Sequence, residues 1–267
     1  AGRRGGWARR GGGRCGRPAG GDGSAPRPAG LLAVSSQTWP PAATARLGPV
    51  TIRDGQGGGK RVSAATVAGG ASDELIDAAE DDMRELGQPP LFMIRPGGTA
   101  LDAHLARRGY AELDPTVIYL CEVARLTDRP LPRVTALTVW EPLQIMREIW
   151  TEAGIGPARQ AVMDRADCPK TGILGRWNDS PAGAAYVGLH GGVAMVHAVE
   201  VLPHQRRQGV AGWMMRAAAL WAAPQGATHV AALVTRDNAA GNALYAALGM
   251  TPAGGYHYRI LAGEEAA

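Results

Sequence analysis

VAMVHAVEVLPHQRRQGVA, residues 193–211, combines an apolar segment, a basic loop and the start of a helix. Its first part, residues 193–201, is apolar and rich in valine, which predicts a buried β-strand. A basic loop follows, and residues 212–223 have the composition of a helix. The first turn of a helix leaves backbone N–H groups unpaired and carries a positive partial charge. The stretch therefore predicts an anion-binding strand–loop–helix unit.

The loop residues fit that prediction. Gly209 allows a close approach of the backbone to a ligand, since it has no Cβ. Arg206 and Arg207 add positive charge for a polyanionic ligand.

A second strand–helix unit lies downstream, in VAALVTRDNAAGNALYAALGM, residues 230–250. Residues 230–235 are apolar and predict a strand. Asn238 stands where a helix N-cap belongs, and Gly249 stands where the helix should end.

Together the two units resemble the GNAT superfamily of acetyl-CoA-dependent N-acetyltransferases. The matching residues are Arg206-x-x-Gly209-x-Ala211 and Asn238-(x6)-Tyr245-(x3)-Gly249, and the resemblance covers roughly residues 134–261. It implies a mixed α/β (α+β) acyl-CoA N-acyltransferase fold, in which helices flank a central mixed β-sheet. It also implies that acetyl-CoA, the cosubstrate, binds where two central strands diverge.

The resemblance further implies the site residues. Tyr245 would protonate the leaving CoA thiolate, and no metal is expected. The expected acetyl-CoA contacts come from the first strand, the loop and the second unit: Val199, Val201, Arg206, Arg207, Gln208, Gly209, Val210, Ala211 and Asn238.

The general base is less well defined by the sequence. Many members of the superfamily carry a carboxylate at a position that aligns with Leu233, which cannot accept a proton. Glu200, acting through a water molecule, is the catalytic carboxylate that we assign. His197 on the same strand stays an alternative, and period-two alternation places it on the opposite face from Glu200. His257 and Tyr256 on the last predicted strand stay open as well.

The N-terminal half looks like a partial repeat of the C-terminal half. A shift of 140 positions superimposes residues 91–94, 101–108 and 116–119 on 231–234, 241–248 and 256–259. Residues 72–86, an amphipathic helix by apolar spacing, superimpose on the helix after the loop. The chemistry is absent from the first copy, because Leu105 replaces Tyr245 and Thr66 replaces Arg206. We therefore predict a degenerate acetyltransferase-like lobe over residues 37–125.

The catalytic domain is predicted over residues 134–267, after a linker at 124–133. Residues 135–150 contain apolar side chains at helical spacing, and a second helix is expected after Pro157. In the superfamily this region lines the acceptor groove, so Arg147, Glu148 and Arg159 are candidates for acceptor contact.

Composition limits the remaining possibilities. Residues 1–30 contain seven Arg and one Asp, a net charge of +6, while the whole chain carries +4, so the remainder carries −2. The Gly/Arg/Pro-rich residues 1–36 are expected to be a disordered tail. No stretch approaches the ~20 apolar residues of a membrane span. Cys15, Cys121 and Cys168 are widely spaced, which favours a reducing cytoplasm over a disulfide framework.

We expect a cytoplasmic N-acetyltransferase that moves an acetyl group directly to a primary amine of a small molecule or peptide. A non-catalytic acyl-CoA-binding or regulatory protein on the same fold is the alternative. Membrane partners are not expected, and a nucleic-acid role would rest on the Arg/Gly tail alone. The acceptor and the oligomeric state stay open.

Overall fold

The structure, a computed structural model, describes residues 8–9 and 26–264. The chain divides into two compact units. Of the described residues, unit 1 contains 8–9, 40–116 and 255–264, and unit 2 contains 26–39 and 117–254.

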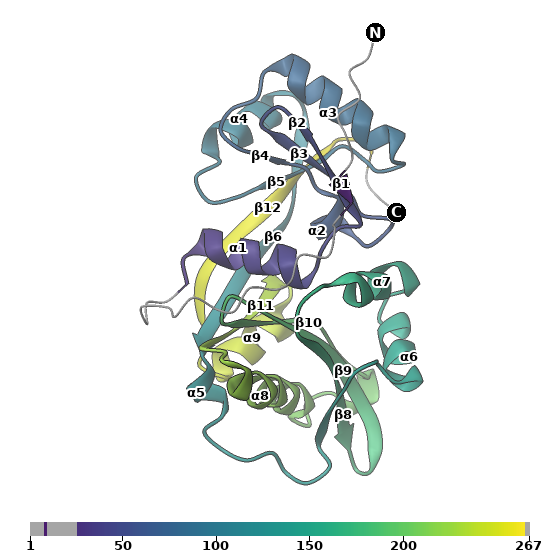
Figure 1. Ribbon diagram of the computed structural model, residues 1–267, viewed down its shortest axis with the longest axis vertical. Helices are drawn as coiled ribbons and strands as arrows, with labels where there is room; N and C mark the ends of the chain where they lie inside the picture. Colours follow the sequence, from purple (N-terminus) through teal and green to yellow (C-terminus); the bar gives the residue numbers. More distant parts are fainter. Residues whose placement is uncertain (1–7, 10–25, 265–267) are drawn as a thin grey trace. The chain divides into compact units, whose positions relative to one another are not determined.

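Unit 2 is built on a mixed β-sheet (Figure 1). Strands β7, β8, β9 and β10 pair in antiparallel fashion, and β10 pairs with β11 in parallel. The strand β6 follows β11 in the sheet order and enters unit 2 with its residues 117–122. The bounds are β6 (Tyr110–Glu122), β7 (Ala136–Val139), β8 (Lys170–Trp177), β9 (Ser180–His190), β10 (Val193–Val201) and β11 (His229–Thr235).

Helices cover both faces of this sheet. A Cβ built on Gly175 of β8 would lie 2.8 Å from Met214 of α8, whereas one on Gly172 would lie 2.6 Å from Met146 of α6. The two helices therefore pack on opposite faces, and glycine permits the close approach at both positions. The α and 3-10 helices of unit 2 are α1 (Pro28–Thr38), α5 (Val123–Leu126), α6 (Gln144–Glu152), α7 (Pro157–Arg165), η1 (Pro203–Gln205), α8 (Val210–Ala222), η2 (Ala223–Gln225) and α9 (Ala239–Ala247).

Unit 1 has a smaller version of the same arrangement. Its apolar core lies between α3, α4 and the strands β3 and β5. The C-terminal part of β12 pairs with β5 in antiparallel fashion, from His257 opposite Ile94 to Ile260 opposite Leu91. The elements are β1 (Ala8–Arg9), β2 (Ala43–Leu47), β3 (Val50–Asp54), α2 (Lys60–Ser63), β4 (Thr66–Val67), α3 (Asp73–Glu85), β5 (Leu91–Ile94), α4 (Thr99–Arg107) and β12 (Thr251–Leu261).

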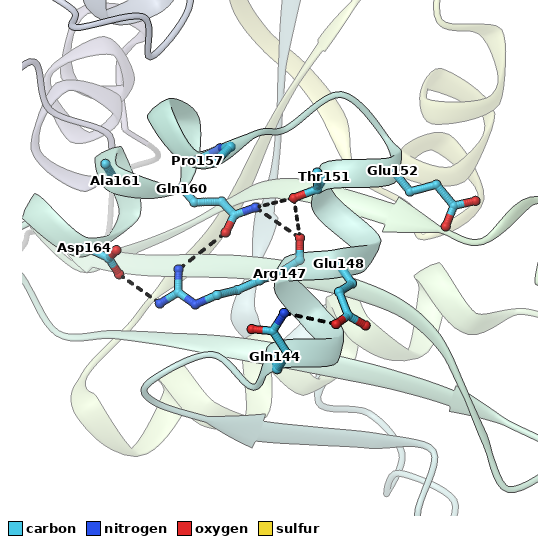
Figure 2. A pocket seen from close by; sticks show the side chains of 9 residues that line it. All are labelled: Gln144, Arg147, Glu148, Thr151, Glu152, Pro157, Gln160, Ala161 and Asp164. Atoms are coloured by element: carbon cyan, nitrogen blue, oxygen red, sulfur yellow. Dashed lines mark hydrogen bonds and ion pairs between the residues drawn. The ribbon is translucent and has the colours of Figure 1, made fainter.

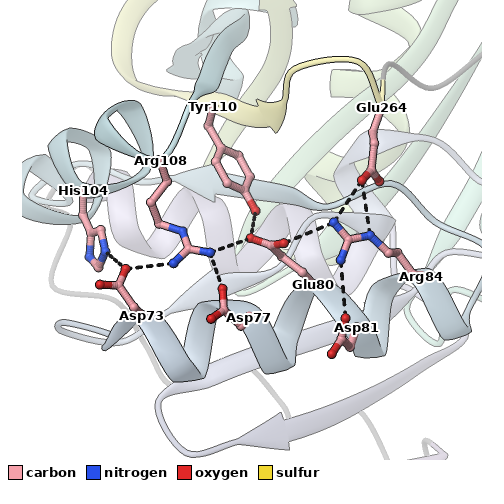
Figure 3. A network of polar contacts seen from close by, with 9 residues as sticks. All are labelled: Asp73, Asp77, Glu80, Asp81, Arg84, His104, Arg108, Tyr110 and Glu264. Atoms are coloured by element: carbon pink, nitrogen blue, oxygen red, sulfur yellow. Dashed lines mark hydrogen bonds and ion pairs between the residues drawn. The ribbon is translucent and has the colours of Figure 1, made fainter.

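Charged side chains tie α3 and α4 together in unit 1 (Figure 3). Arg108, the C-cap of α4, forms ion pairs with Asp73, Asp77 and Glu80 of α3. Hydrogen bonds from His104 and Arg108 lower the pKa of the Asp73 carboxyl below its usual value. The Arg108 guanidinium thereby offsets part of the negative charge of α3. The full network is Asp73, Asp77, Glu80, Asp81, Arg84, His104, Arg108, Tyr110 and Glu264.

The predicted internal repeat is confirmed. Helix α4 begins at Thr99 and α9 at Ala239, which is 140 positions later, and both helices have nine residues. Gly109 and Gly249, which follow them, both have positive φ values, of 85° and 72°. The match is looser for α3, which begins at Asp73 and so lies 137 positions before α8, which begins at Val210.

Each unit takes its last strand from the other repeat. In unit 1 the strand beside β5 is the C-terminal part of β12, which follows α9. In unit 2 the strand beside β11 is the C-terminal part of β6, which follows α4. The two repeats have therefore exchanged their final strands.

The predicted tail at residues 1–36 is wrong for its last part. Residues 28–38 form α1, which begins with a proline in its first turn and buries Leu31, Leu32 and Val34. Burial of these side chains outweighs a composition that suggested disorder. Ala8 and Arg9 pair with Thr44 and Ala43. Residues 1–7 and 10–25, and with them the proposed nucleic-acid arm, lie outside the described residues.

Other predicted boundaries also need correction. Residues 136–139, expected in a helix, form the strand β7, because their pairing with β8 outweighs the helical spacing of the apolar side chains. Part of the expected linker is the short helix α5, which begins at Val123. The change from unit 1 to unit 2 falls at residues 116 and 117, and residues 255–264 belong to unit 1 rather than to the predicted C-terminal domain.

Candidate active site

The two central strands of unit 2 part from each other. Strands β10 and β11 pair only over residues 193–196 and 229–232, although β10 continues to Val201 and β11 to Thr235. Beyond the paired residues, the backbone polar groups on the facing edges need other partners. This gap is a place where a ligand's amide groups can take the role of a neighbouring strand.

A β-bulge in β10 lies just beyond the paired segment. His197 is opposite Tyr186 of β9 and Glu200 is opposite Ala184, so two residues of β10 stand against one of β9. Ala198 in the bulge has a φ of 50°, which is uncommon for a residue other than glycine. The extra residue changes the alternation of the strand. His197 and Glu200 therefore lie on the same face of the sheet, and the expectation that they lie on opposite faces is wrong.

Glu200 has the environment of a proton acceptor. Burial raises the pKa of its carboxyl above the usual value, and the positive charges of Arg206 and Arg159 oppose that shift only in part. A carboxylate with a raised pKa is a stronger base than an ordinary one.

His197 is held as part of the core. Its ring is 4% exposed and lies between Trp39, at 5.1 Å, and Tyr186, at 5.9 Å between ring centroids. The Thr38 hydroxyl lies 2.8 Å from His197 Nε2 and 3.0 Å from the carbonyl of Val34. This buried hydrogen bond engages His197 Nε2, so His197 has the environment of a core residue and not of an exposed base.

The other two alternatives have partners within unit 1. His257 Nε2 lies 2.8 Å from Asp102 Oδ1, and the hydroxyl of Tyr256 accepts from Tyr258 at 3.5 Å. Glu200 is the one carboxylate carried by the described strands β10 and β11.

The loop between β10 and α8 is exposed, as predicted. Arg206, Arg207, Gln208 and Gly209 are all exposed, and Val210 behind them is buried. Arg207 and Gly209 have φ values of 59° and 79°, so the chain turns tightly into the helix. Among the described residues, no side chain caps the start of α8. The first N–H groups of the helix are therefore open to an anion.

The loop also anchors itself to the strand. The Arg206 Nε–H donates to the carbonyl of Val201 at 3.2 Å, which leaves the rest of its guanidinium at the surface. Ala211 in the first turn is half-buried against the core.

The second strand–helix unit has the predicted cap. Asn238 Oδ1 accepts from the Gly241 N–H at 2.8 Å and so caps α9. Asn242, which we had not singled out from the sequence, donates to the carbonyls of Thr235, Arg236 and Asn238 and closes the turn. The Asn-x-x-x-Asn spacing of 238 and 242, one helical turn, was the available signal.

Tyr245 lies on the buried face of α9. Its side chain is 5% exposed, and its ring centroid is 5.5 Å from that of Tyr119. The Tyr119 hydroxyl donates to Asn242 Oδ1 at 3.1 Å. Tyr245 is therefore held by packing on the helix that follows β11.

The corresponding gap of unit 1 is filled by the chain itself. Residues 66–67 pair with β3, and Ala65 bridges to Phe92 of β5 in parallel, with two hydrogen bonds of 2.8 Å. Arg53 fastens this segment, since it donates to the carbonyl of Ala64 at 2.7 Å and to Thr66 Oγ1 at 3.0 Å. Residues 64–67 thus occupy the place that is open between β10 and β11 in unit 2.

A groove of about 780 Å³ runs between α6 and α7 (Figure 2). Arg147 and Glu148, both candidates for acceptor contact, line it, whereas Arg159 does not. Gln160 joins the two helices through hydrogen bonds to the Arg147 carbonyl, Thr151 Oγ1 and the Ile155 carbonyl. Arg147 is already paired with Asp164, at 3.6 Å.

The described residues contain neither a candidate metal site nor a membrane-spanning helix. They contain no group of three or more His, Cys, Asp or Glu side chains suited to hold a metal ion. In the same part of the chain, no helix is both long and apolar enough to cross a membrane.

Comparison with known proteins identifies the class of this site. Residues 140–250 match the family model of the acetyltransferase (GNAT) family. No curated protein sequence matches significantly. Residues 140–250 thus match an acetyltransferase (GNAT) domain, and the members of this family are acyltransferases.

Solved structures share the fold over both units. A GCN5-related N-acetyltransferase from Kribbella flavida is 18% identical, with a TM-score of 0.60 over 82% of this chain and 89% of that one. A functionally unknown conserved protein from Staphylococcus epidermidis is 11% identical, with a TM-score of 0.60 over 83% and 93%. A tandem GNAT protein from the clavulanic acid biosynthesis pathway is 17% identical, with a TM-score of 0.55 over 86% of each chain. The last of these agrees with the internal repeat found here.

Proposed function

We propose that the protein is an N-acetyltransferase that moves an acetyl group from acetyl-CoA to a primary amine. The observation that carries this proposal is the gap between β10 and β11 beside the uncapped, basic start of α8. The amide-containing pantetheine arm of acetyl-CoA can form hydrogen bonds with the strand edges that face the gap, while its pyrophosphate binds the loop.

Different residues bind different parts of acetyl-CoA in this proposal. The pyrophosphate binds the exposed loop through Arg206, Arg207, Gln208 and Gly209 and through the first amides of α8, at Val210 and Ala211. The backbone of Val199 and Val201 faces the pantetheine arm, and the Asn238 amide contacts the cosubstrate from the second unit. Acetyl-CoA is in this proposal a cosubstrate, and no metal takes part.

The transfer is direct. Glu200 accepts a proton from the acceptor's ammonium group through a water molecule, and the neutral amine attacks the thioester carbonyl carbon. The C–N bond forms as the C–S bond breaks, and Tyr245 gives its phenolic proton to the departing thiolate. The nitrogen then loses its second proton, which returns through water to the Tyr245 phenolate and leaves the neutral amide, while Glu200 releases the first proton to solvent. A backbone N–H at the bulge stabilises the negative charge on the carbonyl oxygen.

A covalent intermediate on cysteine is disfavoured. Burial raises the pKa of the Cys121 thiol to about 11, which keeps it protonated and weakly nucleophilic. We place the reaction in the cytoplasm, in keeping with the wide spacing of the three cysteines in the sequence.

The experiment is calorimetric titration with acetyl-CoA, followed by an acceptor screen with amines. We expect saturable binding and transfer with intersecting double-reciprocal lines. Tyr245→Phe should lower kcat by about 10² while the Kd for acetyl-CoA changes little. Binding without transfer to any amine would instead indicate an acyl-CoA-binding or regulatory protein. A folded protein that binds no acetyl-CoA at millimolar concentration would contradict both.

A further inference from the structure

The bulge in β10 brings His197 and Glu200 to one face of the sheet. A side chain of another element forms a hydrogen bond to the backbone of this bulge. Trp150 of α6 is fully buried, and its indole Nε1–H donates to the carbonyl of Ala198 at 2.9 Å. Ala198 is the residue with a φ of 50°. One hydrogen bond therefore stabilises the most unusual backbone position of β10.

The direction of this bond matters for the neighbouring peptide. In a trans peptide the C=O and the following N–H point in opposite directions. When the Ala198 carbonyl points toward the indole, the Val199 N–H points away from it. Trp150 thus sets the orientation of the whole 198–199 peptide group.

The same bond sets the alternation of the strand end. Because of the bulge, Glu200 of β10 lies opposite Ala184 of β9. If the register of β10 against β9 shifted by one residue, the Glu200 side chain would point to the other face of the sheet. A positive φ at alanine costs on the order of 1 kcal/mol, so an unsupported bulge would tend to relax.

We propose that Trp150 is a positioning residue for the acyl transfer, because its bond to Ala198 fixes the Val199 N–H and the face on which Glu200 lies. This inference rests on the proposed function. In this proposal Trp150 acts through the backbone of β10, at the Ala198 carbonyl, and not through contact with the reacting groups.

The test is a cycle of two substitutions, Trp150→Phe and Ala198→Gly. The phenylalanine fills most of the buried volume but donates no hydrogen bond. We expect about tenfold or greater loss of kcat with a Kd for acetyl-CoA within about threefold of wild type. Glycine adopts a positive φ without strain, so Trp150→Phe with Ala198→Gly should recover most of the lost kcat. Trp221→Phe, on half-buried Trp221 of α8, is the matched control and should retain full kcat.

A second measurement separates positioning from simple packing. Burial raises the pKa of Glu200, so a relaxed bulge that exposes it should move the acidic limb of the kcat/KM profile to lower pH. The charges that act on this carboxyl are Arg206 and Arg159, and neither is changed by the substitutions.

Each result of these experiments either supports or contradicts the positioning role of Trp150. An unchanged kcat and acidic limb in Trp150→Phe would overturn the inference, as would a loss that Ala198→Gly fails to recover. If Trp150→Phe does not fold, a folded and active double variant still supports the bond, and an unfolded or inactive one contradicts it. If wild type transfers to no amine, the proposed function fails, and the coupling between the two substitutions in thermal unfolding still reports whether the contact exists.

Discussion

Glu200 is half-buried and lies on the strand beside the gap, which is true of no other carboxylate on β10 or β11. Its folded pKa is raised, so folding favours the protonated form. The stability that this provides is complete below the unfolded pKa and is lost as pH rises through the folded value. Above the folded value the ionised carboxylate therefore opposes folding while it serves as the base.

Replacing Glu200 should therefore lower the activity but not the thermal stability. Glu200→Gln should lower kcat by about 10² or more, because glutamine cannot accept the proton. The same variant should unfold at an equal or higher temperature than wild type at pH 7, with the difference vanishing at pH 4. Steady-state rates and thermal melts at the two pH values check this. Asp179→Asn, at an exposed turn, is the control. A variant with unimpaired kcat would remove Glu200 from the mechanism.

Some of the site residues and their local conformations could be predicted from the sequence. Spacing alone identified Gly209, whose φ is 79°, and the cap at Asn238, since turns and caps have strong local preferences. It did not locate the bulge of β10, because Ala198 is an ordinary residue whose conformation depends on Trp150, 48 positions earlier in the chain. Periodicity could not show which face Glu200 takes.

Among the elements, the clearest difference between the repeats is the segment 64–67. It pairs with β3 on one side and with β5 on the other, whereas β10 and β11 are open beyond residues 196 and 232. The sequence showed that the cations and the tyrosine were missing from the first copy. It could not show that the gap is filled, because the pairing joins residues that are distant in sequence.

This difference predicts one acetyl-CoA per chain. Calorimetry should give a stoichiometry of one, and loss of Arg53 should leave it unchanged. Desolvation lowers the pKa of buried Arg53 to about 10, and its bonds to Ala64 and Thr66 are buried. Arg53→Met should therefore destabilise unit 1 by about 1–3 kcal/mol, since it leaves buried acceptors unpaired.

Lys60→Met is the matched control for this experiment. The Lys60–Asp114 pair is 2.8 Å long but about one-third exposed on each side chain, so its removal should cost little. Two acetyl-CoA molecules per wild-type chain would show that the segment 64–67 does not exclude the ligand.

Over the whole molecule, the exchanged strands make the two repeats depend on each other. The N-terminal repeat lacks its own strand beside β5 and receives residues 257–260 from the C-terminal end of the chain. The sequence predicted the repeat and the two lobes, but it assigned residues 255–264 to the second lobe. The shift of 140 positions shows which elements of the two repeats are equivalent. It does not show whether a strand pairs within its own repeat or with the other repeat.

The exchange predicts how truncation affects folding. A chain that ends at Gly254 lacks the partner of β5, so the edge of β5 and the core side chains Phe92 and Ile94 lose cover. We expect unit 1 to become susceptible to limited proteolysis within residues 40–116, because burying this apolar surface supplies much of its stability. A chain that ends at Leu261 keeps all four paired residues, and loses only exposed contacts such as Arg84 with Glu264, so it should melt close to wild type. A peptide of residues 255–264 added to the shorter chain should restore protection, because it supplies the missing strand. Full protection of residues 40–116 without that peptide would mean that unit 1 folds without the exchanged strand.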